Sequence, residues 1–257
     1  MTDNLGVKTQ QTKPASEPGQ DGDRALVLRL RGEIDRAVQP VLSDGTRFAL
    51  IDFPNSGNVG DAAIWMGERA WLERAGIEIV HTCDRYTYSR SRLQRELKDG
   101  VILWHGGGNL GDLWPAAQAF REQVLAEFPD NRIVQLPQSV WFADPRNADR
   151  ATSVFDNHPN LHLLLRDTPS LRRARKLFAA PSSLCPDMAF ALDIPEPPVE
   201  AVRDFVWLSR TDLEAADDRG EPPQGVVPID WLSDLTPGLG RPLTTYSGCA
   251  TNKVITG

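Results

Sequence analysis

The chain is organised around the stretch Val101-Ile-Leu-Trp-His-Gly-Gly-Gly-Asn-Leu-Gly-Asp112. Four apolar residues lead into three glycines and an asparagine, and a helical pattern opens with Asp112 and Pro115. We therefore expect a buried strand, a tight βα loop and the start of a helix. Glycine tolerates positive φ and has no side chain, so such a loop lets a ligand approach its backbone amides. The stretch predicts a binding loop.

A second copy of this loop occurs earlier in the chain. The residues Gly57-Asn58-Val59-Gly60-Asp61 repeat Gly108-Asn109-Leu110-Gly111-Asp112 almost letter for letter. The earlier copy also follows a strand-like run, residues 48–53, and precedes a helical segment. We expect the two loops to lie side by side at one edge of a parallel sheet and to share one crevice.

Composition limits the classes of function. The 257 residues carry a formal net charge of −7, which argues against a nucleic-acid surface, because such a surface needs clustered cations. The three cysteines show no C-x-x-C spacing, so neither a disulfide framework nor a metal site is expected, and a cytoplasmic location fits. Residues 1–23 are polar and are expected to form a disordered tail.

Strand and helix patterns alternate from residue 24 to residue 192. A leading amphipathic helix is expected from Arg24, because apolar residues recur at every fourth position. Strands are expected at 48–53, 77–80, 101–104, 132–136 and 161–165, and helices at 61–75, 89–98, after 112 and from Thr168. The strand at 132–136 is expected to stop at Pro137. This alternation predicts an α/β fold with a Rossmann-like, doubly wound parallel sheet, in which ligands bind at the carboxyl ends of the strands.

The remaining residues predict an incomplete second domain. Residues 193–204 contain Pro195, Pro197 and Pro198, which is typical of a stiff linker. One more strand is expected at 205–209. Residues 205–257 are too few for a second α/β domain, since a domain usually has on the order of 100 residues. We interpret them as the truncated start of one.

The loop residues favour a polar ligand that is not a bare pyrophosphate. Asp61 and Asp112 would each cap a helix N-terminus, the position that a phosphate would otherwise take. Hydroxyl-bearing ligands such as sugars suit asparagine and aspartate side chains and free amides. Trp65, Trp104 and Trp114 lie near the loops and are either flat faces for a sugar or core residues.

Two residues next to these loops could take part in chemistry. His105 is either a ligand donor or general acid, or a residue that only bonds a backbone carbonyl. Arg166 follows a strand and could clamp a phosphate or carboxylate with its two-pronged guanidinium. The alternative for Arg166 is an ion pair with Asp167 or Asp187.

A dinucleotide site is a weaker interpretation. Gly106-x-Gly108-x-x-Gly111 matches the spacing G-x-G-x-x-G, but the next strand ends in Gln135-Leu136-Pro137 and lacks the acidic residue that binds the ribose. The Gly-Lys-Ser/Thr of a P-loop is also missing.

Six ordered motifs together resemble the polysaccharide pyruvyl transferase family, especially members from exopolysaccharide operons. The resemblance covers about residues 47 to 231. The motifs are Pro54-Asn55-x-Gly57-Asn58-x-Gly60-Asp61, the loop Gly106 to Asp112, Pro137-Gln138-Ser139, Arg166-Asp167, Pro186-Asp187-Met188 and Arg210-Thr211-Asp212.

The resemblance implies an enzyme with two Rossmann-like domains, similar to glycosyltransferases of the GT-B type. Such an enzyme moves pyruvate from phosphoenolpyruvate onto a sugar of an exopolysaccharide, or of its lipid-linked precursor, as a ketal. No cofactor or metal is implied beyond the donor substrate. The resemblance also implies a cytoplasmic protein. The partners that it implies are membrane-bound polysaccharide assembly enzymes at the inner face of the membrane. The substrate-binding residues expected are Asn55, Asn58, Asp61, His105, Gly107, Gly108, Asn109, Asp112, Gln138, Ser139, Arg166 and Arg210.

The chain departs from the family near its end. Family members continue into a second domain with an Arg-Leu-His motif, which the resemblance connects with the donor site, whereas here no histidine follows His162. Residues 238–257 resemble an early stop or a frame-shifted tail. We therefore expect the catalytic histidine to lie outside this chain, and the short chain to transfer little or no pyruvate. Alternatives are a GT-B-type glycosyltransferase and a non-catalytic sugar-binding remnant.

Calorimetry can test the nucleotide alternatives. Because the strand after the triple glycine lacks a ribose-binding carboxylate, we expect neither NADH nor a UDP-sugar to bind measurably. A micromolar dissociation constant for either ligand would instead favour an oxidoreductase or a glycosyltransferase.

Overall fold

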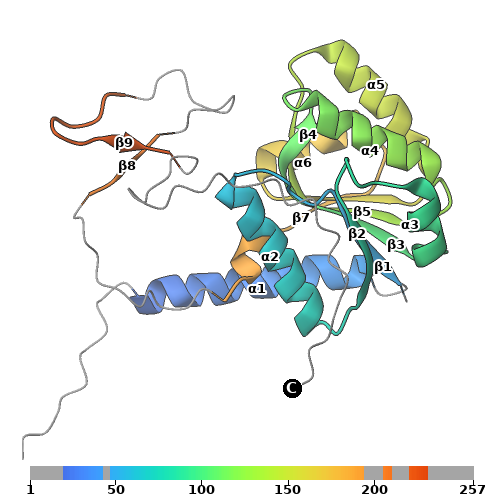
Figure 1. Ribbon diagram of the computed structural model, residues 1–257, viewed down its shortest axis with the longest axis horizontal. Helices are drawn as coiled ribbons and strands as arrows, with labels where there is room; N and C mark the ends of the chain where they lie inside the picture. The colour runs from blue at the N-terminus through green and yellow to red at the C-terminus, as the bar shows by residue number, and fades with distance from the viewer. Residues whose placement is uncertain (1–19, 43–46, 194–204, 210–219, 231–257) are drawn as a thin grey trace, which may run out of the picture. The chain divides into compact units, whose positions relative to one another are not determined.

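The computed structural model describes residues 20–42, 47–193, 205–209 and 220–230 (Figure 1). The chain divides into two units, Met1–Glu196 and Pro197–Gly257. The first unit holds a large sheet with its helices. In the second unit, the described residues form one parallel pair of two-residue strands, β8 (Trp207–Leu208) and β9 (Pro228–Ile229).

The first unit contains a seven-stranded sheet in which every pair of neighbouring strands is parallel. Its strands are β1 (Phe48–Ile51), β2 (Ile79–Cys83), β3 (Val101–Trp104), β4 (Gly107–Gly111), β5 (Ile133–Trp141), β6 (Leu161–Leu165) and β7 (Ser182–Leu184). The helices are α1 (Gln20–Leu42), α2 (Val59–Arg74), α3 (Arg90–Leu97), α4 (Pro115–Glu127), α5 (Pro145–Asp156), α6 (Thr168–Leu177) and the 3-10 helix η1 (Met188–Ala191). The strand order is β2-β1-β3-β5-β6-β7, and β4 also pairs with β5.

Helices cover both faces of this sheet (Figure 1). Successive residues of a strand point to opposite faces, so each strand contributes to two apolar clusters. Ala49 and Ile102 pack with buried residues of α3, α4, α5 and α6, whereas Leu50 and Leu103 pack with α1, α2 and η1. Strands buried on both faces are why β1 and β3 consist of consecutive apolar residues. The Rossmann-like, doubly wound α/β fold is confirmed.

The strand order reverses direction next to β1. From β1 the chain crosses to β2 on one side and then returns to β3 on the other, and both β2 and β3 pair with β1. In parallel sheets, the carboxyl ends on either side of such a reversal form the crevice where ligands bind. The segments that follow β1 and β3 lie at this point, so their predicted position at one edge is confirmed.

The segment after β3 differs from the expected loop. The chain leaves β3 at His105 and Gly106 and continues as β4, which pairs with the carboxyl half of β5. Gly111 has a φ of 135°, and a Cβ at this position would lie 1.6 Å from the carbonyl oxygen of Trp141. Part of the glycine signal therefore reflects close backbone packing inside the sheet. The helix begins at Pro115, not at Asp112.

Strand β5 passes through Pro137 where we expected it to stop. Pro137 has no N–H to contribute to a ladder, and prolines inside sheets occur at irregularities. Here the register between β5 and β6 shifts between Gln135 and Gln138. The neighbour of β5 on its other side changes from β3 to β4 in the same region. The proline thus occupies an irregular point of the sheet, and the strand resumes after it.

Some helix boundaries also differ from the prediction. Helix α5 was not expected, although Asp144 caps it by accepting a hydrogen bond from the Arg146 N–H, and Pro145 occupies its first turn. These residue types are an ordinary helix-start signal. Helix α6 is capped by Asp167 and not by Thr168. Helix α1 begins at Gln20, so residues 20–23 of the expected tail are helical.

Several expectations fall on residues outside the described ranges. They concern the tail at 1–19, the linker at 194–204, Arg210, and the chain from residue 231 onward. The second domain and its resemblance to GT-B enzymes stay predictions. Within the described ranges, none of the helices combines the length and the apolar character needed to cross a membrane.

The packing of α2 on η1 can be tested at Gly67. A Cβ built on this glycine would lie 1.9 Å from the Met188 carbonyl oxygen. Because backbone would have to move, Gly67→Ala should lower the free energy of unfolding by about 1–3 kcal/mol. The control is Gly22→Ala in α1, where nothing lies within 4 Å of the added Cβ; it should leave stability unchanged or raise it by up to about 1 kcal/mol. Urea unfolding followed by circular dichroism measures both, and equal effects would contradict the close packing.

Candidate functional site

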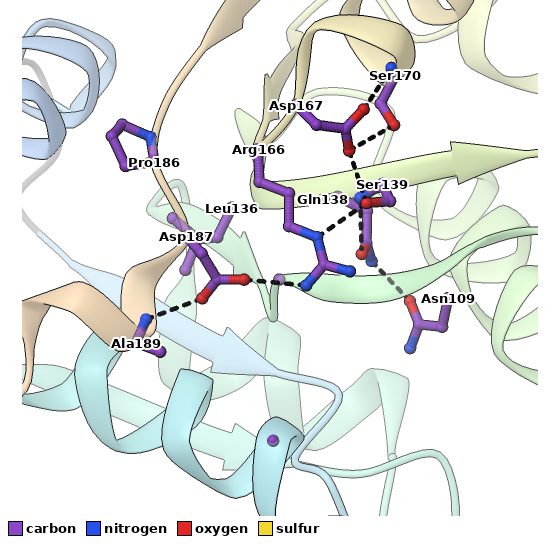
Figure 2. A network of polar contacts seen from close by, with 12 residues as sticks. Asn109, Leu136, Gln138, Ser139, Arg166, Asp167, Ser170, Pro186, Asp187 and Ala189 are labelled. Carbon is purple, nitrogen blue, oxygen red and sulfur yellow. Dashed lines mark hydrogen bonds and ion pairs between the residues drawn. The ribbon is translucent and has the colours of Figure 1, made fainter. Parts of the chain in front are cut away.

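Polar side chains gather where the strands of the large sheet end. Arg166 follows β6, and Ser139 lies in the last third of β5. The Arg166 Nε donates to the Ser139 hydroxyl oxygen over 2.8 Å, and its Nη1 donates to an Asp187 carboxylate oxygen over 2.9 Å (Figure 2). The ion pair with Asp187 that we considered as an alternative is therefore present. Within the described residues, the Arg166 Nη2 makes no hydrogen bond, and the side chain is 30 % exposed.

Both carboxylates around Arg166 are held by backbone amides. Asp167 accepts hydrogen bonds from the Ser170 N–H over 2.7 Å and from the Ser139 hydroxyl over 2.8 Å. Burial alone would raise the pKa of Asp167, but these bonds and the charge of Arg166 outweigh it and lower the pKa. Asp187 accepts from the Ala189 N–H over 2.9 Å. The guanidinium is thus fixed in direction before any ligand arrives.

Asn109 and Gln138 connect this cluster to a buried arginine. The Asn109 Oδ1 accepts from the Gln138 Nε2 over 2.7 Å and from the Arg121 Nη2 over 2.8 Å. The Asn109 Nδ2 lies 3.4 Å from an Asp52 carboxylate oxygen. Arg121 is buried, and its Nε donates to the Gln135 Oε1 over 2.8 Å; burial lowers the pKa of Arg121 to about 10. The oxygen and the nitrogen of the Asn109 side chain thus both contact other residues of the protein, which fixes the position of β4.

Asp52 has a strained backbone conformation. It follows β1 with a φ of 68°, which is uncommon for a residue with a side chain and which occurs at functional sites. Its carboxylate also accepts from the Trp104 Nε1 over 3.0 Å. Trp104 and Trp65 are buried in the two apolar clusters, so the interpretation of both as core residues is confirmed.

His105 is paired with a carboxylate that the sequence did not reveal. Glu68 of α2 is fully buried, and its two oxygens accept from the His105 Nδ1 and from the Gly106 N–H, each over 2.8 Å. Burial alone would lower the pKa of His105, but the charge and hydrogen bond of Glu68, with Asp52 and Asp61, raise it above its usual value. The His105 Nε2 has no hydrogen-bond partner among the described residues. Glu68 gave no sequence signal, because a glutamate within a helix is usually on its exposed side.

The first loop supplies three more of the expected residues. Asn58 caps α2 by accepting from the Gly60 N–H over 2.9 Å, so it has the role that we had given to Asp61. Asn55 is exposed and donates to Asp84 over 3.0 Å. Asp61 lies in the first turn of α2, and a Cβ on Gly107 would lie 3.8 Å from its Oδ1. The two predicted loops thus approach each other at Asp61 and Gly107.

Asp112 has a structural role that differs from a helix cap. Its carboxylate accepts from the N–H groups of Ala143 and Asp144, each over 2.8 Å, and from the Asn147 side chain. Burial alone would raise the pKa of Asp112, but these hydrogen bonds lower it. Asp112 therefore holds the connection between β5 and α5. Gly108 lies half-buried within β4, and Arg210 lies outside the described residues.

The contact between Glu68 and His105 can be tested by unfolding. Glu68→Gln removes the charge of a buried pair, so the free energy of unfolding should fall by about 3–5 kcal/mol near pH 6. The pKa of His105 is raised in the folded state. The contribution of the pair to the free energy of unfolding is therefore fully present below the unfolded-state pKa of about 6.5, and it is lost as the pH rises through the folded-state pKa. The difference in the free energy of unfolding between wild type and Glu68→Gln should therefore narrow as the pH rises above about 6.5.

The control uses the chain's other buried histidine that bonds a glutamate. The His81 Nδ1 lies 2.7 Å from the Glu96 Oε2, but the Glu96 side chain is 28 % exposed. Glu96→Gln should cost about 1 kcal/mol or less. If Glu68→Gln lowers the free energy of unfolding no more than Glu96→Gln does, or lowers it by the same amount at every pH, the buried pair does not anchor the segment after β3.

Comparisons with known proteins show the family to which the chain belongs. The family model for polysaccharide pyruvyl transferase matches residues 58–234. EpsO of Bacillus subtilis (strain 168), named as a pyruvyl transferase, is 33% identical over 193 residues, which cover 74% of this chain and 58% of EpsO. Pyruvyl transferase 1 of Schizosaccharomyces pombe is 34% identical over 185 residues, covering 68% of this chain and 46% of that protein.

A third relative carries a less specific name. General stress protein 30 of Bacillus subtilis is 29% identical over 189 residues, covering 70% of this chain and 54% of that protein. The chain spans about half the length of the curated relatives that it matches. The matched residues include the segments after β3, β5 and β6 that form the site, and of the segment between β1 and α2 they include Asn58. The protein belongs to the polysaccharide pyruvyl transferase family.

Proposed function

We propose that this protein binds phosphoenolpyruvate at Arg166 and takes part in transferring its pyruvyl group to two hydroxyls of a sugar as a ketal. The observation that carries the proposal is the fixed guanidinium at the carboxyl end of β6, whose Nη2 is left without a hydrogen bond among the described residues. Arginine is suited to this task because its planar fork matches carboxylate and phosphate oxygens.

The proposed reaction makes specific demands on the site. The methylene carbon of the enol accepts a proton from a general acid, and one sugar hydroxyl attacks the carbon that bears the phosphate. The second hydroxyl then displaces inorganic phosphate. Of the two protons that the hydroxyls lose, one restores the general acid and the other leaves with the phosphate. The enzyme must therefore bind two negative groups, stabilise charge as it develops, and hold two hydroxyls in place.

Arg166 alone does not balance the charge of such a donor. Asp167 and Asp187 flank it, so these three groups together carry one negative charge when both carboxylates are ionised. Further cations must therefore face the donor. Arg210, which the resemblance to the family suggests, lies outside the described residues and stays a prediction. Ser139 then contributes a polar group beside Arg166, and the buried Gln138 supports the site through its hydrogen bond to Asn109. We assign no general acid, because His105 is buried and bonded to Glu68.

The remaining expectations become part of the proposal. No metal and no cofactor other than the donor substrate is required. The acceptor is a saccharide of an exopolysaccharide or of its lipid-linked precursor, and the protein works in the cytoplasm, near membrane-bound assembly enzymes. The names of the relatives support the pyruvyl transferase chemistry.

Calorimetry with phosphoenolpyruvate tests the proposal. Arg166→Ala should weaken binding about 10- to 100-fold, because a hydrogen bond to a charged group contributes about 1.5–3 kcal/mol. The control is Arg29→Ala, which removes an exposed arginine of α1 paired with Glu33 and should leave the dissociation constant unchanged. Equal affinity in wild type and Arg166→Ala, or absence of binding in wild type, would contradict a donor site at Arg166.

A further inference from the structure

An exposed tryptophan lies beside the proposed donor site. Trp141 is the last residue of β5 and is 50% exposed. Other tryptophans of the described part of the chain are more enclosed, and Trp65, Trp71 and Trp104 are buried. Exposing half of a large aromatic side chain loses favourable burial, so the position of this ring calls for a reason.

The ring of Trp141 is held in place from one side. The guanidinium carbon of Arg173, in α6, lies 4.9 Å from the ring centroid. The Arg173 Nη1 donates to the Val140 carbonyl oxygen over 3.2 Å, which fixes the cation against the ring. A cation over one aromatic face is attracted by the ring's quadrupole. The stack leaves the exposed part of an ordered, flat ring available to a ligand.

Trp141 and the Arg166 cluster lie on the same side of the sheet. Trp141 follows Ser139 by two residues, so the two side chains leave the strand in the same direction, about 7 Å apart. Ser139 contacts Arg166 and Asp167 at the start of α6, and Trp141 contacts Arg173 of the same helix. Trp141 and the residues around Arg166 thus border the same helix, α6.

The surroundings of Trp141 favour a sugar over an apolar partner. Among residues 139–150, Trp141 is the large hydrophobic side chain that is exposed, and the segment that follows it carries Asp144, Arg146 and Asn147. A protein-docking surface usually presents a contiguous apolar patch. A single flat apolar face framed by polar groups matches a pyranose, which has an apolar C–H face and hydroxyls at its rim.

We propose that Trp141, backed by Arg173, is the platform on which the acceptor sugar stacks. This inference rests on the proposed function and adds to it the position of the acceptor. A sugar on this ring directs its hydroxyls toward the donor at Arg166, as ketal formation requires. Trp141 and Arg173 are not among the site residues that we expected from the sequence.

The experiment follows the indole N–H signals in ¹⁵N NMR spectra of the full chain. Methyl β-D-galactopyranoside, methyl β-D-glucopyranoside and methyl N-acetyl-β-D-glucosaminide are titrated in turn, and the Trp141 signal is assigned from its loss in Trp141→Phe. We expect at least one glycoside to shift this signal. Trp141→Leu should weaken binding of that glycoside at least fivefold, whereas Trp141→Phe should retain most of the affinity because a flat aromatic face remains.

The matched control is a second aromatic residue with an arginine over its ring. Tyr86 is 70% exposed, and the Arg85 guanidinium carbon lies 4.6 Å from its centroid, but it follows β2, on the far side of β1 and β3 from β5. Tyr86→Leu should leave glycoside binding unchanged. Thermal unfolding of each variant establishes that it is folded.

The outcomes separate the platform from the donor site. The proposed platform is wrong if no glycoside shifts the Trp141 signal, or if Trp141→Leu binds the glycoside as tightly as Tyr86→Leu does. Either result would count against it even where phosphoenolpyruvate still binds at Arg166. If Trp141 instead makes the chain self-associate, measured by the loss of dimer in Trp141→Leu, the platform is also wrong. If a glycoside binds at Trp141 and phosphoenolpyruvate does not bind, the platform stands and the proposed donor fails.

Discussion

The buried carboxylate of Glu68 holds together the part of the fold on which the site depends. It accepts one hydrogen bond from His105 and one from the Gly106 N–H, and so it joins α2 to the point where β3 gives way to β4. A buried charge is costly unless it is paired and hydrogen-bonded. The pairing with a histidine of raised pKa meets that requirement. The chain is thereby held at the break between β3 and β4, both of which run parallel to β5.

Hydrogen bonds between polar side chains connect this point to the rest of the sheet. Strand β4 pairs with β5, and Asn109 of β4 accepts hydrogen bonds from Arg121 and Gln138. Gln138 precedes Ser139, which meets Arg166. The site is therefore preorganised by buried groups that do not themselves face a ligand, as functional sites require of their supporting residues. Substitutions at Asn109 or Arg121 are expected to act on the site through the position of β4.

The sequence predicted the parts of the structure that follow from periodicity. The apolar runs at Phe48 and Val101 indicated buried parallel strands, and the repeated Gly-Asn-x-Gly-Asp indicated two neighbouring segments at one edge. Periodicity could not show that the copy at Gly108–Asp112 lies in a strand, because glycine is found both where backbones pack closely and in open loops. Nor could it show that β5 continues beyond Pro137, since the register shift that accommodates the proline depends on the neighbouring strands.

Arg166 and its neighbour Ser139 were predicted from the sequence, whereas some of the residues that support them were not. Arg166 and Ser139 were found from their position after strands and from family motifs. Glu68 and Arg121 were missed because charged residues in helices usually face solvent, and their partners come from distant parts of the chain. Trp141 was missed because its exposure depends on where β5 ends, and the strand was expected to end earlier.

The central claim is that the ligand site lies at the carboxyl ends of β5 and β6. Backbone amide chemical shifts, recorded while phosphoenolpyruvate is titrated into the full chain, test it most directly. The account predicts that the largest shifts among the described residues occur at Ser139, Arg166, Asp167 and Ser170. Largest shifts at the amino ends of the strands, such as Phe48 and Val101, would contradict it.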